Sequence, residues 1–153
     1  WHPGRKQWAV MTSEGVMLAD ERLTPAGMVV TNQQLRAWMN DATVGVGSIG
    51  LHNSCVCWSP NGQQVAFEIA SGRGIFVYDF PGNRLHLPAW SADWVVDYRV
   101  GSFSPDGEFL VCTVEARATP GRTQLHSVRW ARPQEAYLLV SLDGIQRACW
   151  GAR

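Results

Sequence analysis

The side chains that could do chemistry are scattered along this sequence rather than grouped. No two histidines stand at the His-x3-His or Glu-x-x-His spacing that lets neighbouring residues share a metal ion. No serine lies in a Gly-x-Ser-x-Gly elbow, and no Ser, Cys or Thr stands recognisably beside a base. We therefore predict a protein without catalytic residues, metal or cofactor. The four histidines are His2, His52, His86 and His126.

Residues 45–50 form a literal Gly-x-Gly-x-x-Gly motif. A dinucleotide site needs a strand before such a motif and a helix that opens at its last glycine. The residues that follow lead instead to Cys55, Trp58 and a Ser-Pro turn, which is a strand context. We interpret the motif as a loop between structural units.

The four cysteines give no metal-binding signature. Cys55 and Cys57 are two residues apart and share a face if they lie in a strand, whereas Cys112 and Cys149 stand alone. Since free cysteine behaves as a small apolar residue, we predict buried free thiols.

The tryptophan and arginine residues give the best indication of function in this sequence. Eight tryptophans occur, and three of them fall in segments without a clear strand pattern: Trp90, Trp94 and Trp130. Packing beneath loops is the simpler explanation, but large aromatics outside a core are also enriched at protein interfaces. Four arginines surround Trp130 in the sequence. The candidate partner interface is therefore Trp90, Trp94, Arg117, Arg122, Arg129, Trp130 and Arg132.

The composition of the chain argues against some classes of partner. The chain has 153 residues, 46% of them hydrophobic and 17% charged, with 13 basic and 13 acidic side chains. This is a globular composition with no net field that would attract nucleic acid or an anionic membrane. No apolar run approaches the roughly 18 residues of a membrane span. We expect protein partners, not nucleic acid, and assign no small-molecule ligand.

A short sequence phrase that occurs twice indicates the structural elements that position these residues. Residues 57–67 read Cys-Trp-Ser-Pro-Asn-Gly and then an apolar run, and residues 102–112 read Ser-Phe-Ser-Pro-Asp-Gly and then an apolar run. The two copies are about 45 residues apart, the period of a four-stranded β-propeller blade. The positions that define the repeat are Trp58, Pro60, Gly62, Tyr78, Phe103, Pro105 and Gly107.

The second unit is the clearest. Strands are expected at 54–58, 65–69, 75–80 and 84–87, separated by turns at 59–62, 71–74 and 81–83, which together make an antiparallel meander. The third unit begins near Val100, turns at 104–107 and returns at 109–114. We interpret the polar residues 115–124 as an exposed insertion and residues 137–142 as the next strand, aligned with 75–80. Asp143 and Gly144 then form a hairpin turn, and 145–150 close the unit.

The first unit is fainter. Residues 8–11 and 16–19 are expected to form strands on either side of a turn at 12–15, with a further strand at 27–31. Residues 32–42 fit two alternatives. Leu35, Trp38, Met39 and Ala42 fall on one face of a short helix that Asn32 could cap, and a fourth strand is the other possibility.

The repeated phrase resembles the WD40-like repeats of the TolB family and of the propellers in prolyl-oligopeptidase-type enzymes. Residues 54–88 match the aromatic-Ser-Pro-Asp-Gly turn, the apolar strand and the aliphatic-aromatic strand ending in Asp, with Asn61 in place of the usual Asp; residues 100–114 match the first two. The resemblance implies an all-β protein of four-stranded antiparallel propeller-type blades. In such a propeller, Asp93 and Asp97, near Arg99, could reach the channel mouth where ligands bind; we favour a solvated loop with local ion pairs.

The chain supplies only about three such units, at 7–53, 54–98 and 99–150, whereas propellers close with 4–8 blades. Either the chain is a segment of a larger propeller, or partner chains complete it, or the units roll into a sandwich; we favour the first two. We predict a non-catalytic scaffold or interaction subunit of a larger assembly. The alternative is a propeller domain of a peptidase or hydrolase, or a periplasmic TolB-like protein. Both the bacterial periplasm and a eukaryotic intracellular complex fit this sequence.

Overall fold

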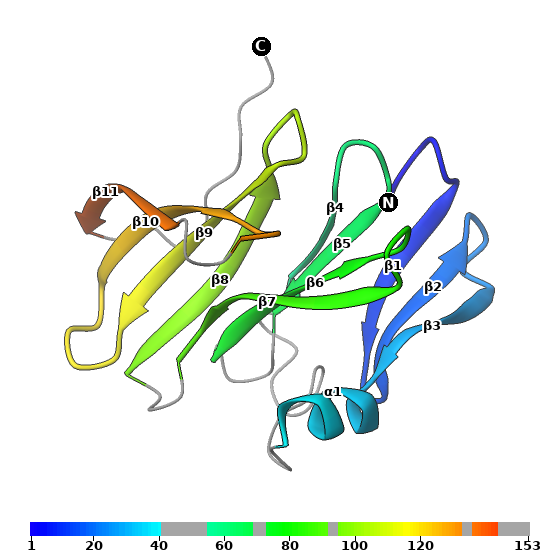
Figure 1. Ribbon diagram of the computed structural model, residues 1–153, viewed down its shortest axis with the longest axis horizontal. Helices are drawn as coiled ribbons and strands as arrows, with labels where there is room; N and C mark the ends of the chain where they lie inside the picture. Colours follow the sequence, from blue (N-terminus) through cyan, green and yellow to red (C-terminus); the bar gives the residue numbers. More distant parts are fainter. Residues whose placement is uncertain (41–54, 69–72, 92–94, 133–135, 144–153) are drawn as a thin grey trace.

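Three antiparallel sheets lie side by side in the computed structural model, which describes residues 1–40, 55–68, 73–91, 95–132 and 136–143 (Figure 1). Each sheet is a meander in which consecutive strands pair. The first contains β1 (Gln7–Thr12), β2 (Gly15–Asp20) and β3 (Pro25–Thr31). The second contains β4 (Val56–Trp58), β5 (Gln64–Glu68), β6 (Gly74–Asp79) and β7 (Arg84–Trp90). The third contains β8 (Val96–Phe103), β9 (Phe109–Ala116), β10 (Arg122–Arg129) and β11 (Ala136–Asp143).

The prediction of a mostly β chain with antiparallel meanders is confirmed, and of the alternatives for residues 32–42, a helix is formed by the described residues 32–39. Helix α1 (Asn32–Met39) follows β3 directly. Its cap is Thr31 rather than Asn32: the Thr31 hydroxyl accepts from the Gln34 N–H, and the Gln34 side chain accepts from the Thr31 N–H. This reciprocal pair is a capping box, which satisfies two backbone donors at the helix start. Asn40 ends the helix in a left-handed conformation.

The second sheet is the middle layer and has a core on each face. All five residues of β5 are buried. Val65 and Phe67 pack with Val16 and Leu35 of the first unit, whereas Ala66 between them belongs to the core shared with the third sheet. Because side chains alternate between the faces of a strand, burial of every β5 residue requires cover on both sides.

The two copies of the repeated phrase form turns with the same hydrogen bonds. The Ser59 hydroxyl donates to Asn61 and accepts from the Gln64 N–H, and the Ser104 hydroxyl does the same with Asp106 and the Phe109 N–H. In each turn the glycine N–H bonds back to the serine carbonyl oxygen. Gly62 and Gly107 have φ of 69° and 77°, a left-handed conformation that glycine adopts without steric cost.

The first unit turns differently, which explains its faint match. Thr12 pairs with Gly15 across a hairpin whose loop is Ser13 and Glu14, and the Thr12 hydroxyl donates to the Gly15 carbonyl oxygen. The predicted strands on either side of this turn and the strand at 27–31 are confirmed as β1, β2 and β3. The repeat turn is thus specific to the second and third sheets.

The predicted exposed insertion at 115–124 is wrong. Only residues 117–121 turn between strands, because β9 extends to Ala116 and β10 begins at Arg122. β10 is the third strand of its sheet, so residues 137–142 belong to the fourth strand, β11, and do not correspond to 75–80. β8 begins at Val96, and residues 96–98, assigned by the repeat to the second unit, therefore start the third sheet.

The first strands of the sheets lie next to one another, since β4 contacts β1 on one side and β8 on the other. Within the described part of the chain, no helix is both long and apolar enough to cross a membrane. The hairpin predicted at Asp143 and Gly144, the closing strand at 145–150 and the glycine motif at 45–50 lie outside the described residues.

Candidate functional site

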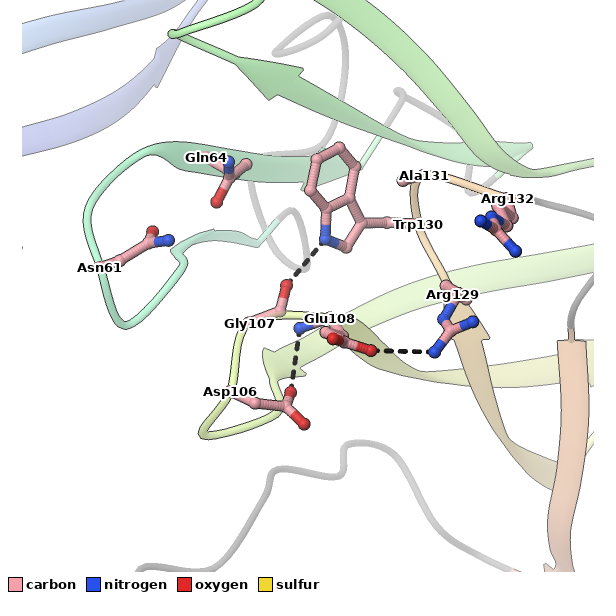
Figure 2. A pocket seen from close by; sticks show the side chains of 9 residues that line it. All are labelled: Asn61, Gln64, Asp106, Gly107, Glu108, Arg129, Trp130, Ala131 and Arg132. Carbon is pink, nitrogen blue, oxygen red and sulfur yellow. Dashed lines mark hydrogen bonds and ion pairs between the residues drawn. The ribbon is translucent and has the colours of Figure 1, made fainter.

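A cavity of about 380 Å³ opens where the two repeat turns meet the end of β10 (Figure 2). The turns adjoin closely: a β-carbon placed on Gly107 would lie 3.9 Å from Cδ of Pro60. The side chains that shape the cavity come from both turns and from β10. They include Asn61, Gln64, Asp106, Glu108, Arg129 and Trp130.

Trp130 forms the wall between the second and third sheets. Its Nε1 donates to the Gly107 carbonyl oxygen at 2.8 Å (Figure 2). Its ring meets His86 of β7 edge to face, with the centroids 5.1 Å apart. The half-buried indole also packs against the core shared by the two sheets. Trp130 therefore has two roles: one part of its indole packs against the core, and another part lines the cavity.

Arg129 is held over the cavity by two contacts. Its Nη2 donates to Glu108 Oε2 at 2.9 Å, and its guanidinium lies 5.1 Å from the centre of the Phe109 ring. Both partners are partly exposed, with relative accessibilities of 32% and 58%, so this ion pair contributes little to folding. Its effect is to place a cation and a carboxylate together at the cavity mouth.

The two turns present an amide and a carboxylate at equivalent positions. Asn61 Oδ1 accepts from Ser59 and the Gln63 N–H, and Asp106 Oδ1 accepts from Ser104 and the Glu108 N–H. The hydrogen bond from Ser104, followed by that from the Glu108 N–H, lowers the pKa of Asp106 below its ordinary value. The turn that contains Asp106 thus holds a stable negative charge, whereas the turn that contains Asn61 is neutral.

This difference predicts how the turn responds to acid. Because the pKa of Asp106 is lowered on folding, its stabilising effect is complete above the unfolded value of 3.8 and is lost as the pH falls through the folded value. We expect Asp106→Asn to keep the same hydrogen bonds, as Asn61 does, and to remove this acid-dependent loss. Urea unfolding of both proteins between about pH 2 and pH 6 measures it. Parallel pH profiles would contradict the prediction.

The structure brings some predicted interface residues together and separates others. Arg129, Trp130 and Arg132 line one cavity. Arg122 is seven strand positions from Arg129, about 23 Å at 3.3 Å per residue, and Arg117 bonds to Asp97 at that far end. The grouping of all four arginines around Trp130 is therefore wrong, since the chain between them is the extended strand β10.

Trp90 also lies apart from Trp130. Trp90 packs against the core shared with the first sheet, under the guanidinium of Arg73 at 4.5 Å. That core lies on the face of the second sheet opposite Trp130. Trp94 and Asp93 are outside the described residues, and Asp97 pairs with Arg117 rather than Arg99.

The other candidate groups show no joint site among the residues that the structure describes. Cys55, Cys57 and Cys112 are free thiols, and burial raises the pKa of Cys112 to about 12. Within the same residues, no three His, Cys, Asp or Glu side chains gather as metal ligands. Cys149 and His52 are outside the described residues.

The sequence predicts Trp130 as an interface residue but does not predict the opposite wall of this cavity. That wall consists of Asn61, Gln64, Asp106 and Glu108, residues of the repeat turns and of the positions directly after them. The one available signal was the repeat itself, since equivalent turns of stacked units lie at the same end of the fold. Comparisons with known proteins yielded no matching family model, curated protein or solved structure.

Proposed function

We propose that this chain is a non-catalytic interaction or scaffold subunit built from three units of the propeller-blade type. The observation that carries the proposal is the second sheet, whose strand β5 is buried on both faces by its neighbours. Repeat units that stack face to face in this way bury their faces only against further units or partners. The adjoining first strands β1, β4 and β8 support the same arrangement.

Exposed apolar side chains on the two end sheets support a partner-bound role. On the first sheet, Trp8 and Met28 are 37% and 42% exposed. On β11 of the third sheet, three consecutive residues, Tyr137, Leu138 and Leu139, are each at least half exposed. Large apolar side chains exposed on the outer elements of a fold are candidates for contact with a partner.

The Trp130 cavity supplies specificity in this proposal. An indole held by Gly107 and His86 loses little conformational freedom when a partner binds, and Arg129 and Glu108 offer charges of both signs. Tryptophan and arginine are the residue types that dominate interface energies. The described residues that line the cavity include no serine, cysteine or histidine, which agrees with recognition rather than nucleophilic chemistry.

Native mass spectrometry of the purified chain, with identification of the proteins that copurify, tests the proposal. We expect a species heavier than the 17.0 kDa monomer, either with a partner or with further copies. Arg129→Ala and Trp130→Ala should weaken that assembly at least about tenfold, because truncation of a central interface residue costs more than about 1.4 kcal/mol.

Arg117→Ala is the matched control, because Arg117 is also a half-exposed arginine in an ion pair but lies at the other end of the sheet. It should leave the assembly unchanged. A stable, lone monomer would contradict the proposed role. If a complex forms and Trp130→Ala, shown to be folded by circular dichroism, binds as well as wild type, the role of the cavity is refuted.

A further inference from the structure

A second groove, of about 520 Å³, lies on the other face of the second sheet. Val30 of β3 forms one side, and Trp38 of α1 and the β6–β7 hairpin form the others. Tyr78 stands opposite Val65 and Leu85 in the strand register, and Val65 belongs to the core shared with the first sheet. Tyr78 and Leu85 therefore face the first sheet.

Among the described residues the first sheet has three strands where the second has four, and the groove lies beside the last of the three, β3. The described first sheet ends at β3, after which the chain enters α1. Leu35 fills the core, and Trp38 meets Phe76 edge to face with the ring centroids 5.5 Å apart. On the face of the second sheet that is turned toward the first, β6 is thus met by a helix side chain, and Trp38 and Leu85 of β7 both line the groove beside it.

The described walls of the groove combine apolar and aromatic side chains with two amides, Gln34 and Asn83, and one cation. Trp38 is 51% exposed, and the Tyr78 hydroxyl donates to Asn83 Oδ1, which fixes the tyrosine ring. Arg84 is exposed and forms no ion pair with any described residue; the nearby Asp79 accepts from the Gln64 side chain and from the Gly82 N–H. The described residues that line the groove include one arginine and no carboxylate.

We propose that this groove binds an extended acidic peptide of a partner protein. A bulky apolar side chain of the peptide lies between Trp38 and Leu85, and a carboxylate pairs with the guanidinium of Arg84. The planar guanidinium matches a carboxylate through two parallel hydrogen bonds, and an exposed tryptophan beside it supplies a large contact at low entropic cost. This site is separate from the Trp130 cavity, which lies on the opposite face of the second sheet.

Selection from a phage-displayed library of random short peptides tests the proposal directly. We expect enriched peptides that combine glutamate or aspartate with leucine or an aromatic residue. A synthetic copy of the enriched peptide, titrated calorimetrically, should bind Arg84→Gln and Trp38→Ala each at least about tenfold more weakly than wild type. Gln33→Ala, at an exposed position of α1 outside the groove lining, should bind as wild type does.

Two further variants separate the possible outcomes. Arg129→Ala should keep full peptide affinity, so a failure of the Trp130 proposal leaves this one intact. Trp38→Phe retains an aromatic contact on α1 and should recover part of the affinity lost in Trp38→Ala, which a merely unfolded helix would not permit. No enrichment, a basic consensus, or peptides that bind Arg84→Gln as tightly as wild type would overturn the proposal.

Discussion

Phe76→Ala is expected to lower the free energy of unfolding by about 3–5 kcal/mol, the usual cost of removing a buried phenylalanine. Phe76 of β6 is fully buried, and its ring lies 5.7 Å from Phe67 and 5.5 Å from Trp38. It therefore joins the second sheet to α1 and the first sheet. Since a natural domain is typically stable by only about 5–15 kcal/mol, the variant should lose a large share of its stability.

Urea unfolding followed by tryptophan fluorescence measures this effect. Leu110→Ala is the matched variant on the other side of the second sheet: Leu110 is equally buried, but in the core shared with the third sheet, and should cost about 2–5 kcal/mol. Leu139→Ala, at a half-exposed position, should change stability by less than about 0.5 kcal/mol. A cost below about 1 kcal/mol for Phe76→Ala would show that the first and second sheets do not share a core.

What the sequence predicted well was local. The Ser-Pro-Asn-Gly and Ser-Pro-Asp-Gly turns are fixed by short-range hydrogen bonds of Ser59 and Ser104 and by the freedom of glycine at positive φ. The β-branched and aromatic run of β6 was also sufficient to predict a strand. The start of helix α1 is encoded just as locally as these turns and this strand, because Thr31 and Gln34 have the spacing of a capping box.

What failed depends on tertiary packing. β10 is hard to predict because two of its three buried positions are polar: Thr123 and Ser127 are buried along with a single apolar residue, Val128, so the sequence shows no apolar face. Mistaking β10 for a loop then placed Arg122 beside Trp130, when the extended chain holds them at opposite ends of the sheet. The wall formed by Asn61 and Gln64 could not be predicted either, because it depends on how two units stack and not on either unit alone.

The second large effect on stability is expected at Glu68, whose carboxylate links the second and third sheets. Glu68 is 1% exposed, its Oε1 accepts from the backbone N–H of Val100 at 2.7 Å, and its Oε2 lies 3.7 Å from Nη1 of Arg99. Glu68→Ala leaves a buried N–H without this acceptor and a guanidinium without this counter-charge. We expect a loss of about 2–4 kcal/mol, less than for a fully buried pair because Arg99 is 34% exposed and retains access to water.

Two variants distinguish the hydrogen bond of Glu68 from its charge. Glu68→Gln keeps an acceptor for the Val100 N–H but has no charge for Arg99, so it should lose less stability than Glu68→Ala. Glu108→Ala breaks the shorter but exposed pair with Arg129 and should cost at most about 1 kcal/mol. Equal losses for Glu68→Ala and Glu108→Ala in urea unfolding would contradict the argument, because burial of the carboxylate between two sheets, and not the length of its ion pair, makes Glu68 the stronger link.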